Sequence, residues 1–572
     1  MGVKGRITEV RGTVVKATNV SGIQMNEMVR VGELKLIGEV VRVEGDNAYI
    51  QVYEFTTGLR PGEPVEGLGS PLSVTLGPGI IGNIYDGLQR PLSNIEGYSI
   101  SRGYTADPVD MKKKWHFIPT AKQGTKVKGG EKLGYVEETG LIRHYILVPP
   151  NVKGALTFVA PEGDYRVDEQ IAEVKNGEKL ELTMLQKWPV RVPRPFGRRL
   201  VPSEPLVTGQ RVIDTFFPLA KGGSAAVPGG FGTGKTVLLH QIASWANSRV
   251  VVYVGCGERG NEMVELLKTF PKLSDPISGR PIMEKSIMIA NTSNMPVAAR
   301  EASIYVGITL AEYYRDMGYD TLLLADSTSR WAEALREISG RLEEIPAEEG
   351  YPSYLASRIA AFYERAGYVE TLGGDIGSVS IIGAVSPPGG DFTEPVTTHT
   401  LRYVKAFWLL DPNLAYSRHY PAVNWVSSYS SYAEPISKWW TEKISEEFQA
   451  LRRQALDLLF REESLRSIVR LLGPEVLPED EKLVLEAANM LKEGFLKQSA
   501  YHEVDRYSPP EIQYYLLKLI ISFYEKAKEK IKQGKTVEEI KSSPVYLEVV
   551  RAKFNVRSKD DFEALMKKVM EL

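Results

Sequence analysis

The sequence predicts a multidomain α/β protein that comprises an N-terminal β-barrel, an inserted β-sandwich lobe, a doubly wound nucleotide domain and a C-terminal helical bundle. A length of 572 residues is too great for one hydrophobic core. A glycine-rich phosphate loop, GGFGTGKT, lies inside a run of alternating strand and helix patterns. Short strand patterns precede this run, and helical periodicity follows it. The predicted boundaries are 1–72 for the barrel, 73–109 for a connector, 110–190 for the lobe, 191–434 for the nucleotide domain and 435–572 for the helices.

The overall composition is that of a globular protein in a reducing compartment. Hydrophobic residues make up 43% and charged residues 25% of the chain, and the formal net charge is −2. This near-neutral charge gives no reason to expect nucleic acid or an anionic membrane as a main partner. Cys256 is the single cysteine, so no internal disulfide can form. No stretch approaches about 18 uninterrupted apolar residues, and the first residues lack the apolar core of a signal peptide, so we expect any membrane role to come through partner chains.

The N-terminal third contains two β-rich segments on either side of a connector. In 1–72, apolar and polar residues alternate between Gly, Asn and Asp turns, which favours a small barrel, although any β-domain with two polar faces has the same pattern. Gly and Pro punctuate 73–109. Short strands and glycine turns recur in 110–190 and favour a compact sandwich that packs as a separate lobe. His116 and His144 are isolated in this lobe, and we expect each to be structural.

The phosphate loop spans 229–236 and obeys the pattern of Gly, four residues, then Gly-Lys-Thr. An apolar stretch, 225–227, precedes it and a helical pattern follows it, which is the strand, loop and helix order that the motif needs. Glycines admit positive φ and let backbone N–H groups surround an anion, and the positive end of the following helix faces the same phosphates. We expect the Lys235 ammonium at the β and γ phosphates and the Thr236 hydroxyl on a magnesium ion. The predicted nucleotide-binding residues of this stretch are Gly229, Gly230, Phe231, Gly232, Thr233, Gly234, Lys235, Thr236 and Val237.

Two later strands end in residues suited to phosphoryl transfer. The apolar run 250–254 predicts a buried parallel strand whose carboxyl end carries Glu258 and Arg259. A carboxylate there orients a water for attack on the γ-phosphate and an arginine neutralises developing charge, but a solvated ion pair at a strand end explains both residues equally well. The run 321–325 ends in Asp326, as in a strand that presents an aspartate to magnesium, and such aspartates also occur as plain helix caps. Further strands of a mostly parallel sheet are predicted in 286–294, 378–391 and 405–411.

From about residue 435 the pattern is helical. Val484, Ala488, Leu491 and Phe495 recur at intervals of four, three and four, which places them on one face of a helix. A second amphipathic helix runs through 514–535 and ends in lysines. On this pattern alone, the helices are a cap on the nucleotide domain.

The nucleotide domain carries five long motifs, in this order: GGFGTGKT, GCGERGNEM, DSTSRWAEALREIS, EEGYPSYLASRIAAFYERAG and VSPPGGDFTEPVT. Together they resemble the catalytic A subunit of archaeal and vacuolar-type rotary ATPases. The resemblance covers essentially the whole chain and implies a RecA-like nucleotide domain. The segment 110–190 resembles the extra lobe that separates this subunit from the F-type β subunit, and the length is closer to that of the archaeal members.

The resemblance also implies a role for particular residues. Lys235 and Thr236 match the lysine and the magnesium ligand of the family's phosphate loop. Glu258 matches the glutamate that positions the attacking water, Arg259 the arginine that contacts phosphate, and Asp326 the Walker B aspartate. The expected catalytic residues are therefore Lys235, Glu258 and Arg259, and the expected magnesium ligands are Thr236 and Asp326.

Three further positions are compared with the family. Tyr420 matches one aromatic residue of the adenine pocket and Tyr501 the other, although plain packing explains either tyrosine. Thr233 stands where some vacuolar relatives carry a cysteine that is associated with oxidative inactivation, so we expect that control to be absent here.

The resemblance implies the catalytic nucleotide-binding subunit of a rotary ATPase or ATP synthase, which couples ATP hydrolysis or synthesis to proton or sodium transport. The implied cofactor is Mg²⁺ with ATP or ADP. The implied partners are a non-catalytic B-type subunit in an alternating hexamer, central stalk subunits and a membrane ion-translocating sector, with the chain peripheral at the cytoplasmic face of the membrane.

Two other functions fit the same core. A hexameric nucleic-acid translocase needs a basic or aromatic single-strand surface, and the near-neutral charge and the extra lobe disfavour it. A purely structural subunit is disfavoured by the intact set of Lys235, Glu258 and Asp326.

Overall fold

A computed structural model describes residues 3–94, 100–275 and 278–572, which form two compact units. The first unit comprises Met1–Leu200, Ser248–Ser386 and Phe392–Tyr403, and the second Val201–Asn247, Pro387–Asp391 and Val404–Leu572. The five-part division of the sequence is finer than this and stays a prediction. Its barrel, connector and nucleotide domain include residues that lie outside the described ones, namely 1–2, 95–99 and 276–277. Within the described ranges, none of the helices combines the length and the apolar character that crossing a bilayer requires.

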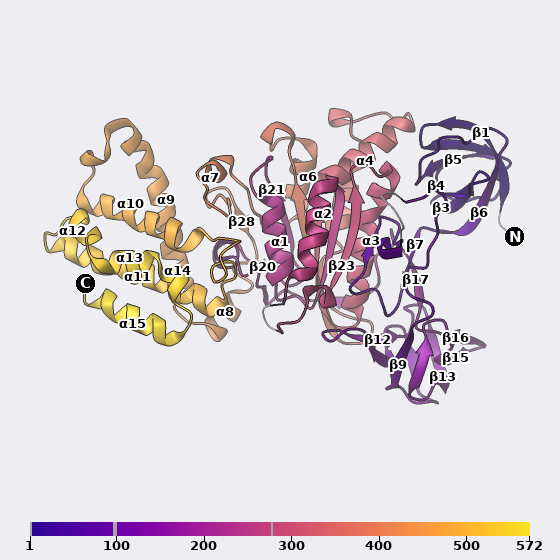
Figure 1. Cartoon of the computed structure of the whole chain (residues 1–572), viewed down its shortest axis with the longest axis horizontal. Coiled ribbons are helices and arrows are strands. Elements are labelled where there is room, and N and C mark those ends of the chain that lie inside the picture. The colour runs from indigo at the N-terminus through magenta and orange to yellow at the C-terminus, as the bar shows by residue number, and fades with distance from the viewer. Residues whose placement is uncertain (1–2, 95–99, 276–277) are drawn as a thin grey trace. The chain divides into compact units, whose positions relative to one another are not determined.

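The N-terminal strands close into an antiparallel barrel, as their alternating pattern predicts (Figure 1). Inward-pointing residues such as Val15, Val29 and Ile50 are fully buried and form its core. Closure pairs each strand on both sides, so that no polar backbone edge is left in contact with the core. The strands, in the order β1-β2-β5-β4-β3-β6, are β1 (Lys4–Arg11), β2 (Val14–Thr18), β5 (Asn47–Val52), β4 (Leu36–Glu44), β3 (Glu27–Val31) and β6 (Pro64–Pro71).

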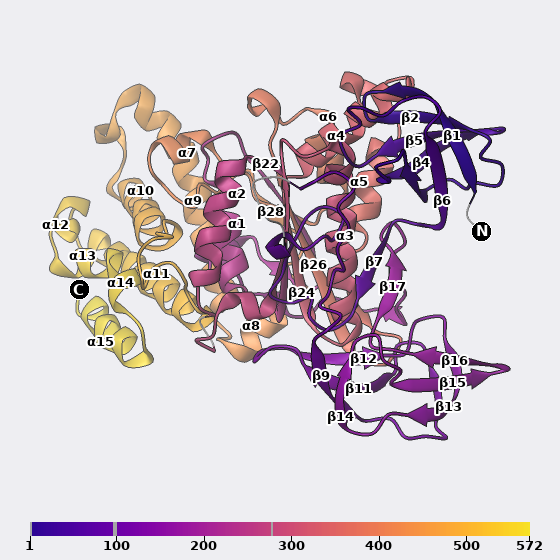
Figure 2. The ribbon, with the colours of Figure 1, turned by 45° about the vertical axis from the view of Figure 1, so that its right-hand side comes forward.

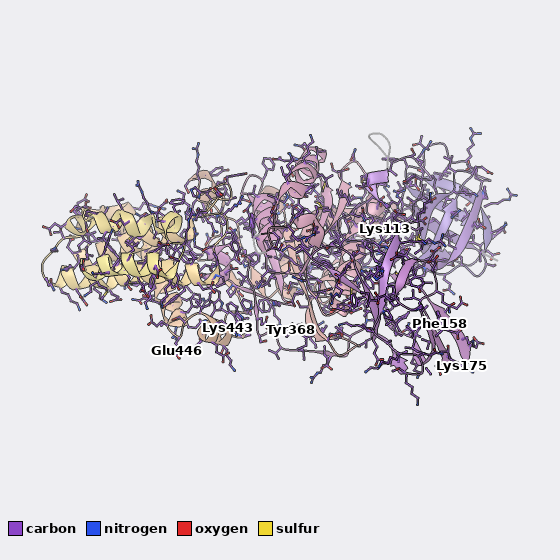
Figure 3. All side chains as sticks on the ribbon, turned by 60° about the horizontal axis from the view of Figure 1, so that its bottom comes forward. Lys113, Phe158, Lys175, Tyr368, Lys443 and Glu446 are labelled. Carbon is purple, nitrogen blue, oxygen red and sulfur yellow. The ribbon has the colours of Figure 1, made fainter. Side chains whose placement is uncertain are left out.

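The lobe consists of two four-stranded sheets, as predicted (Figure 2). Phe158 and Lys175 lie at the surface of the first sheet, where Phe158 is 39% exposed (Figure 3). The first sheet has the order β10 (Lys126–Lys128), β13 (Lys153–Val159), β15 (Ala172–Asn176) and β16 (Glu178–Leu182). The second has the order β12 (Arg143–Leu147), β11 (Lys132–Glu137), β9 (Lys114–Pro119) and β14 (Gly163–Arg166). The chain leaves the lobe through β17 (Gln186–Pro189), which pairs with β7 (Ser73–Leu76).

The two lobe histidines lie in different surroundings. His144 is fully buried, with Nδ1 2.7 Å from Glu138 Oε2 and Nε2 2.9 Å from the Tyr313 hydroxyl. Glu138 also accepts hydrogen bonds from the backbone N–H groups of residues 79–81, so the pair ties the connector to the lobe. His116 lies at the surface beside two carboxylates. Among the described residues, no group of three or more His, Cys, Asp or Glu side chains is placed to hold a metal ion.

The first unit also contains five parallel strands, in the order β26-β24-β22-β23-β8. They are β8 (Ile84–Tyr85), β22 (Val250–Glu258), β23 (Ser286–Thr292), β24 (Asp320–Asp326) and β26 (Ile376–Val385), with β25 (Gly367–Glu370) antiparallel to β26 and β18 (Arg198–Arg199) paired to β25. The α-helices are α2 (Gly260–Thr269), α3 (Val297–Asp316), α4 (Thr328–Arg341), α5 (Leu355–Tyr363) and α6 (Pro395–Tyr403). Helix α3 packs on β22 and β24, and α4 packs on β22 and β26. Because β23 lies on one side of β22 and β24 on the other, the sheet is doubly wound, as predicted.

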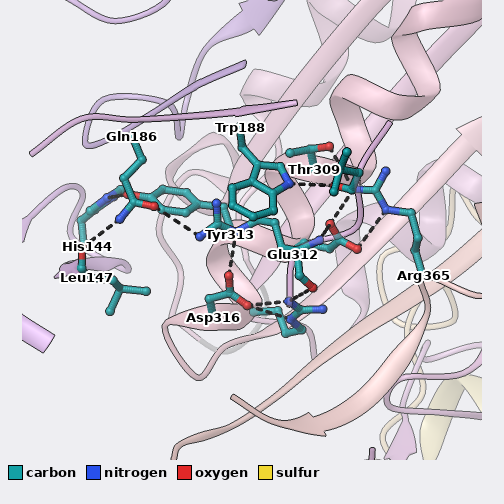
Figure 4. Close-up of polar contacts among 12 residues, drawn as sticks. His144, Leu147, Gln186, Trp188, Thr309, Glu312, Tyr313, Asp316 and Arg365 are labelled. Atoms are coloured by element: carbon teal, nitrogen blue, oxygen red, sulfur yellow. Dashed lines mark hydrogen bonds and ion pairs between the residues drawn. The ribbon is translucent and has the colours of Figure 1, made fainter. Parts of the chain in front are cut away.

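Buried ion pairs fasten two segments, one after β17 and one after α5, to helix α3 (Figure 4). Arg194 Nε donates to Asp316 Oδ2 over 2.7 Å, and Arg365 Nε donates to Glu312 Oε1 over 2.9 Å. The four side chains are each no more than 8% exposed, so removal of Asp316 or Glu312 would leave a buried guanidinium without its carboxylate. The network therefore holds α3 in place, and α3 in turn covers the central strands.

The second unit begins with short strands and ends in helices. Strand β21 (Ser224–Pro228) is parallel to β27 (Ala406–Phe407), which pairs antiparallel with β28 (Tyr429–Ser430). A short pair, β19 (Pro205–Leu206) with β20 (Leu219–Ala220), and the π-helix η2 (Val212–Phe216) precede β21. Helix α1 (Lys235–Trp245) follows β21, and α7 (Pro412–Tyr416) follows β27.

The predicted helical region is confirmed. Val484, Ala488, Leu491 and Phe495 are each at most 1% exposed, and α10 packs on α9 and α11. The helices are α8 (Ser437–Lys443), α9 (Phe448–Leu472), α10 (Glu479–Leu491), η8 (Lys492–Leu496), α11 (Pro510–Lys532), α12 (Val537–Lys541), α13 (Pro544–Val550), α14 (Ala552–Asn555) and α15 (Lys559–Met570).

Candidate nucleotide site

The phosphate loop connects β21 to α1 in the second unit, as the motif requires. The strand is buried throughout, and Gly229 continues its pairing through a bridge to Leu410. A Cβ on Gly229 would lie 2.9 Å from the Leu410 Cβ, so this position tolerates little beyond glycine. Gly232 and Gly234 have φ of 79° and 83°, a conformation that L side chains rarely adopt. The loop backbone therefore explains Gly232 and Gly234, and the contact with Leu410 explains Gly229.

Two polar side chains of the loop, those of Thr233 and Lys235, contact main-chain carbonyl groups of the same loop. Thr233 is 2% exposed and its hydroxyl donates to the Gly230 carbonyl over 2.8 Å. The Lys235 ammonium lies 3.4 Å from the Gly229 carbonyl, at the first turn of α1. This position puts a positive charge beside the positive end of the helix, an arrangement suited to phosphate. Thr236 is half-buried in the same turn, and the loop residue Phe231 is 88% exposed.

Tyr420 lies against the phosphate loop, whereas Tyr501 is placed at the surface. A Cβ on Gly234 would lie 3.1 Å from Tyr420 Cε1, so the ring covers the start of α1. Tyr420 is 39% exposed, which leaves part of the ring open to a ligand. Tyr501 is 88% exposed. The predicted adenine-pocket role of the two tyrosines stays a prediction.

The first unit carries the predicted acidic residues at the carboxyl ends of its central strands. Glu258 ends β22 and Asp326 ends β24, and these two neighbouring strands flank the point where the sheet order reverses. Ligands of doubly wound sheets bind at such a point. Glycine at position 257, with φ of 72°, is also required by space, because a Cβ there would lie 2.9 Å from Arg330 Cβ and 3.0 Å from Arg300 Cδ.

The surroundings of Glu258 are polar and charged. Its carbonyl accepts a hydrogen bond from the Ser293 N–H over 2.9 Å, which fixes the end of the strand. A hydrogen bond to Glu333 and the charges of Glu333 and Glu258 raise the pKa of Arg330. Arg259 precedes α2, with an exposed side chain and an extended backbone. The Glu258 carboxylate therefore lies close enough to Arg330 for its charge to act on that guanidinium.

Asp326 is fully buried and in register with Gly255 of β22. The Tyr253 hydroxyl donates to Asp326 Oδ2 over 3.1 Å, and burial together with the charge of Asp326 raises the pKa of Tyr253. The N-cap of α4 is Ser327, so helix capping is not the reason for this aspartate. A buried carboxylate is an oxygen ligand of the type that Mg²⁺ prefers.

Two buried residues near Tyr420, Arg211 and Gln498, were not predicted from the sequence. Gln498 N donates to the Tyr420 carbonyl over 2.7 Å, and Gln498 Oε1 accepts from Arg211 N over 2.9 Å. Neither residue belongs to a recognisable motif, and their importance depends on contacts with distant segments.

Comparison with known proteins identifies the family. The A subunit of the A-type ATP synthase of Hyperthermus butylicus is 60% identical over 100% of this chain and 97% of its own length. The chain belongs to the family of A-type ATP synthase A subunits. The corresponding A subunit of Methanopyrus kandleri is 57% identical and the V-type ATP synthase alpha chain of Halothermothrix orenii 55%, each over 100% of this chain and 98% of its own length.

Four family profiles match successive parts of this chain. They are the ATP synthase alpha/beta family beta-barrel domain at 7–69, the barrel-sandwich domain at 106–191, the nucleotide-binding domain at 209–430, and the C-terminal domain of V and A type ATP synthase at 437–541. The predicted fold class and family resemblance are thereby confirmed. Among solved structures, the ATPase EscN of the enteropathogenic E. coli type III secretion system has a TM-score of 0.65 and 20% identity over 90% of this chain and 100% of its own, which shows a shared fold alone.

We expect the ATPase activity of this protein to resist disulfide-forming oxidants. Cys256 is buried, burial raises the pKa of its thiol to about 12, and its Sγ donates to the Arg300 carbonyl over 3.4 Å. Thiolate is the reactive form, so this thiol reacts slowly. The phosphate loop itself offers Thr233 in place of a thiol. Steady-state hydrolysis before and after treatment with oxidised glutathione is the measurement, and strong inhibition that a reductant reverses and that maps to this chain would contradict the expectation.

Proposed function

We propose that this chain binds Mg²⁺-ATP or Mg²⁺-ADP and hydrolyses or synthesises ATP as the catalytic subunit of a rotary ATP synthase. The observation that carries the proposal is 60% identity to the A subunit of an A-type ATP synthase over the whole chain, together with a phosphate loop that already has the required backbone. The established family membership supports ATP hydrolysis or synthesis as the reaction, and the order of motifs along the chain supports one nucleotide site built from the following residues.

The second unit supplies the groups that bind the phosphates. The N–H groups of the loop and the Lys235 ammonium stabilise the β and γ phosphates, and the start of α1 adds its positive end. Lys235 already lies beside the loop carbonyls, so little rearrangement is needed for it to reach an anion. Tyr420, at the start of α1, is the residue that contacts the base.

The first unit supplies the groups that act on the attacking water. In the proposal, Glu258 orients the water and takes up its proton, and Arg259 neutralises charge on the γ-phosphate. Asp326 and Thr236 hold the magnesium ion, which when bound neutralises phosphate charge. The Ser293 N–H holds the Glu258 carbonyl and so fixes the main chain at the end of β22 that carries this carboxylate.

The remaining partners follow from the family and the chain's own features. We infer a non-catalytic B-type subunit in an alternating hexamer, stalk subunits that meet the C-terminal helices, and a membrane sector that moves protons or sodium ions. The match of 437–541 to the C-terminal domain of V and A type ATP synthases supports this. The chain is then peripheral at the cytoplasmic face of the membrane.

A test of the proposal separates it from a nucleic-acid translocase with the same core. Hydrolysis by the assembled complex is measured with and without single-stranded RNA or DNA, and proton or sodium uptake is measured in vesicles that contain the complex. A rotary ATPase couples hydrolysis to ion uptake and ignores the nucleic acid. Stimulation by single strands without ion uptake would overturn the proposal.

The Lys235→Ala variant should bind Mg²⁺-ATP about 10- to 100-fold more weakly than the wild type. Hydrogen bonds to charged groups contribute about 1.5–3 kcal/mol, and the Lys235 ammonium bonds to the phosphates of ATP already in the ground state. Isothermal titration of the full chain with Mg²⁺-ATP measures the change. Lys438→Ala is the matched control, because that lysine is 81% exposed in a surface pair with Glu442 and should leave affinity unchanged. Equal affinities of Lys235→Ala and the wild type would remove Lys235 from the site.

A further inference from the structure

A buried glutamine joins three segments of the second unit. Gln498 is 2% exposed, and its main-chain N–H donates to the Tyr420 carbonyl over 2.7 Å. Its side-chain Nε2 donates to the Gly209 carbonyl over 2.8 Å, and its Oε1 accepts from the Arg211 N–H over 2.9 Å. The side chain thus anchors residue 498 to the 209–211 segment, and the main chain of residue 498 anchors Tyr420.

An ion pair holds the same segment from its other side. Arg211 Nη2 donates to Asp505 Oδ1 over 2.7 Å, and each side chain is 1% exposed. Arg211 also donates to the carbonyls of Phe495 and Lys497, over 2.6 and 3.0 Å. A fully bonded buried network of this kind is rigid, because each lost bond leaves an unsatisfied polar group. The chain from 495 to 499 therefore has little freedom.

The position of Tyr420 depends on this rigid segment. Its ring lies over Gly234, the residue that precedes α1. A Cβ on Gly234 would lie 3.1 Å from Tyr420 Cε1. A shift of the Tyr420 backbone would move the ring away from the phosphate loop without altering the loop.

We propose that Gln498 is a positioning residue for nucleotide affinity, which holds the Tyr420 ring beside the phosphate loop and thereby lets the 495–499 segment of the C-terminal region set the affinity for the base. The inference rests on the proposed function of the site. The phosphate contacts are independent of Gln498, because they come from the loop and from α1. Loss of the anchor therefore weakens binding of a ligand with a base and spares a ligand that consists of phosphates alone.

The test compares two ligands on the full-length chain. Gln498→Met keeps the length of the side chain and removes its amide, and binding is measured by isothermal titration with Mg²⁺-ATP and with Mg²⁺-tripolyphosphate. We expect the dissociation constant for ATP to rise about tenfold and that for tripolyphosphate to stay within twofold. Equal weakening of both ligands, or of neither, would overturn the inference.

Gln89→Met is the matched control for the loss of a buried amide. Gln89 is 1% exposed and lies in the first unit, where its side chain accepts from the Thr75 N–H over 2.8 Å and donates to the Thr75 carbonyl over 2.7 Å. It should leave the ratio of ATP to tripolyphosphate affinity unchanged, whatever it does to the melting temperature. The same selective loss of ATP affinity in Gln89→Met would show a general effect of destabilisation and would overturn the inference.

A double-mutant cycle tests whether Gln498 acts through Tyr420. Tyr420→Ala removes the ring, and the double variant should bind ATP no more weakly than Tyr420→Ala alone. Additive losses would mean that Gln498 acts by another route. If Gln498→Met does not fold, Gln498→Glu takes its place, since it keeps the side-chain length and the acceptor for Arg211 N, and the same selective loss is expected.

A kinetic readout in the assembled complex separates positioning from catalysis. KM for ATP should rise about tenfold in Gln498→Met with kcat within twofold, whereas a fall in kcat alone would contradict a role in base affinity. Failure of the proposed function has a different signature. A wild-type chain that binds neither ATP nor tripolyphosphate overturns the nucleotide site itself, and one that binds both equally tightly overturns only the inference about the base.

Discussion

Glu258→Gln is expected to lower steady-state ATP hydrolysis by the assembled complex by two orders of magnitude or more, with ATP still bound. The substitution keeps the shape of the side chain and removes the charge that orients and deprotonates the attacking water. A preorganised group of this kind is worth about 3 kcal/mol or more, and each 1.4 kcal/mol is about a factor of ten in rate. The main chain that carries the carboxylate is fixed here, because Gly257 adopts a positive φ and the Ser293 N–H holds the Glu258 carbonyl.

The control for this variant is Glu265→Gln, an exposed carboxylate on α2 seven positions further along the chain. It should hydrolyse ATP within twofold of the wild-type rate. Binding of Mg²⁺-ATP to Glu258→Gln, measured by isothermal titration, should be close to that of the wild type, which separates loss of chemistry from loss of the site. If Glu258→Gln turns over ATP at a rate near that of the wild type, our assignment of Glu258 is wrong.

The second large effect concerns the isolated chain, which we expect to bind Mg²⁺-ATP but to hydrolyse it 10³- to 10⁵-fold more slowly than the assembled ring. That range is about the contribution of an arginine finger in other phosphate-loop enzymes. The local arginines do not replace such a finger, because Arg330 Nη1 already donates to Glu333 over 2.8 Å and Arg259 is exposed beside Glu258. We propose that the finger comes from the non-catalytic B-type subunit inferred above, so activity should appear when that partner is added.

The measurement is steady-state hydrolysis by the purified chain alone and after reconstitution with the B-type subunit. The mass of the complex from light scattering should correspond to three chains of each kind. A ring reconstituted from Lys235→Ala chains should assemble equally well and stay inactive, which would attribute the recovered activity to this chain. Full activity in the chain alone, while it is a monomer, would rule out a site shared between subunits.

Much of the fold followed from local patterns. The alternation in 1–72 predicted the barrel, and the spacing of Val484, Ala488, Leu491 and Phe495 predicted a buried helical face. Each pattern repeats within a single strand or helix, so it can be recognised without knowing which other segments pack against that strand or helix. The five-part division and the roles of Tyr420 and Tyr501 cannot be predicted from local patterns, because they depend on which distant segments contact one another.

By itself, the sequence determined the family, the phosphate loop and the strand ends that carry Glu258 and Asp326. The physical reason is that the loop places its glycines, lysine and threonine in eight consecutive residues. Asp326 directly follows its apolar run 321–325, and Glu258 lies four residues after the end of the run 250–254. The residues that identify each of these features are therefore close together in the sequence.

Only the tertiary structure decided which distant residues support those motifs. It placed the Tyr420 ring over Gly234, joined Tyr420 to Gln498, and set Asp326 in register with Gly255. These contacts join segments that are far apart along the chain, and their geometry depends on how strands, turns and helices return to one another. The sequence does not distinguish a buried glutamine from a solvated one. The role of Gln498 can therefore be inferred only from its contacts with Tyr420, Gly209 and Arg211.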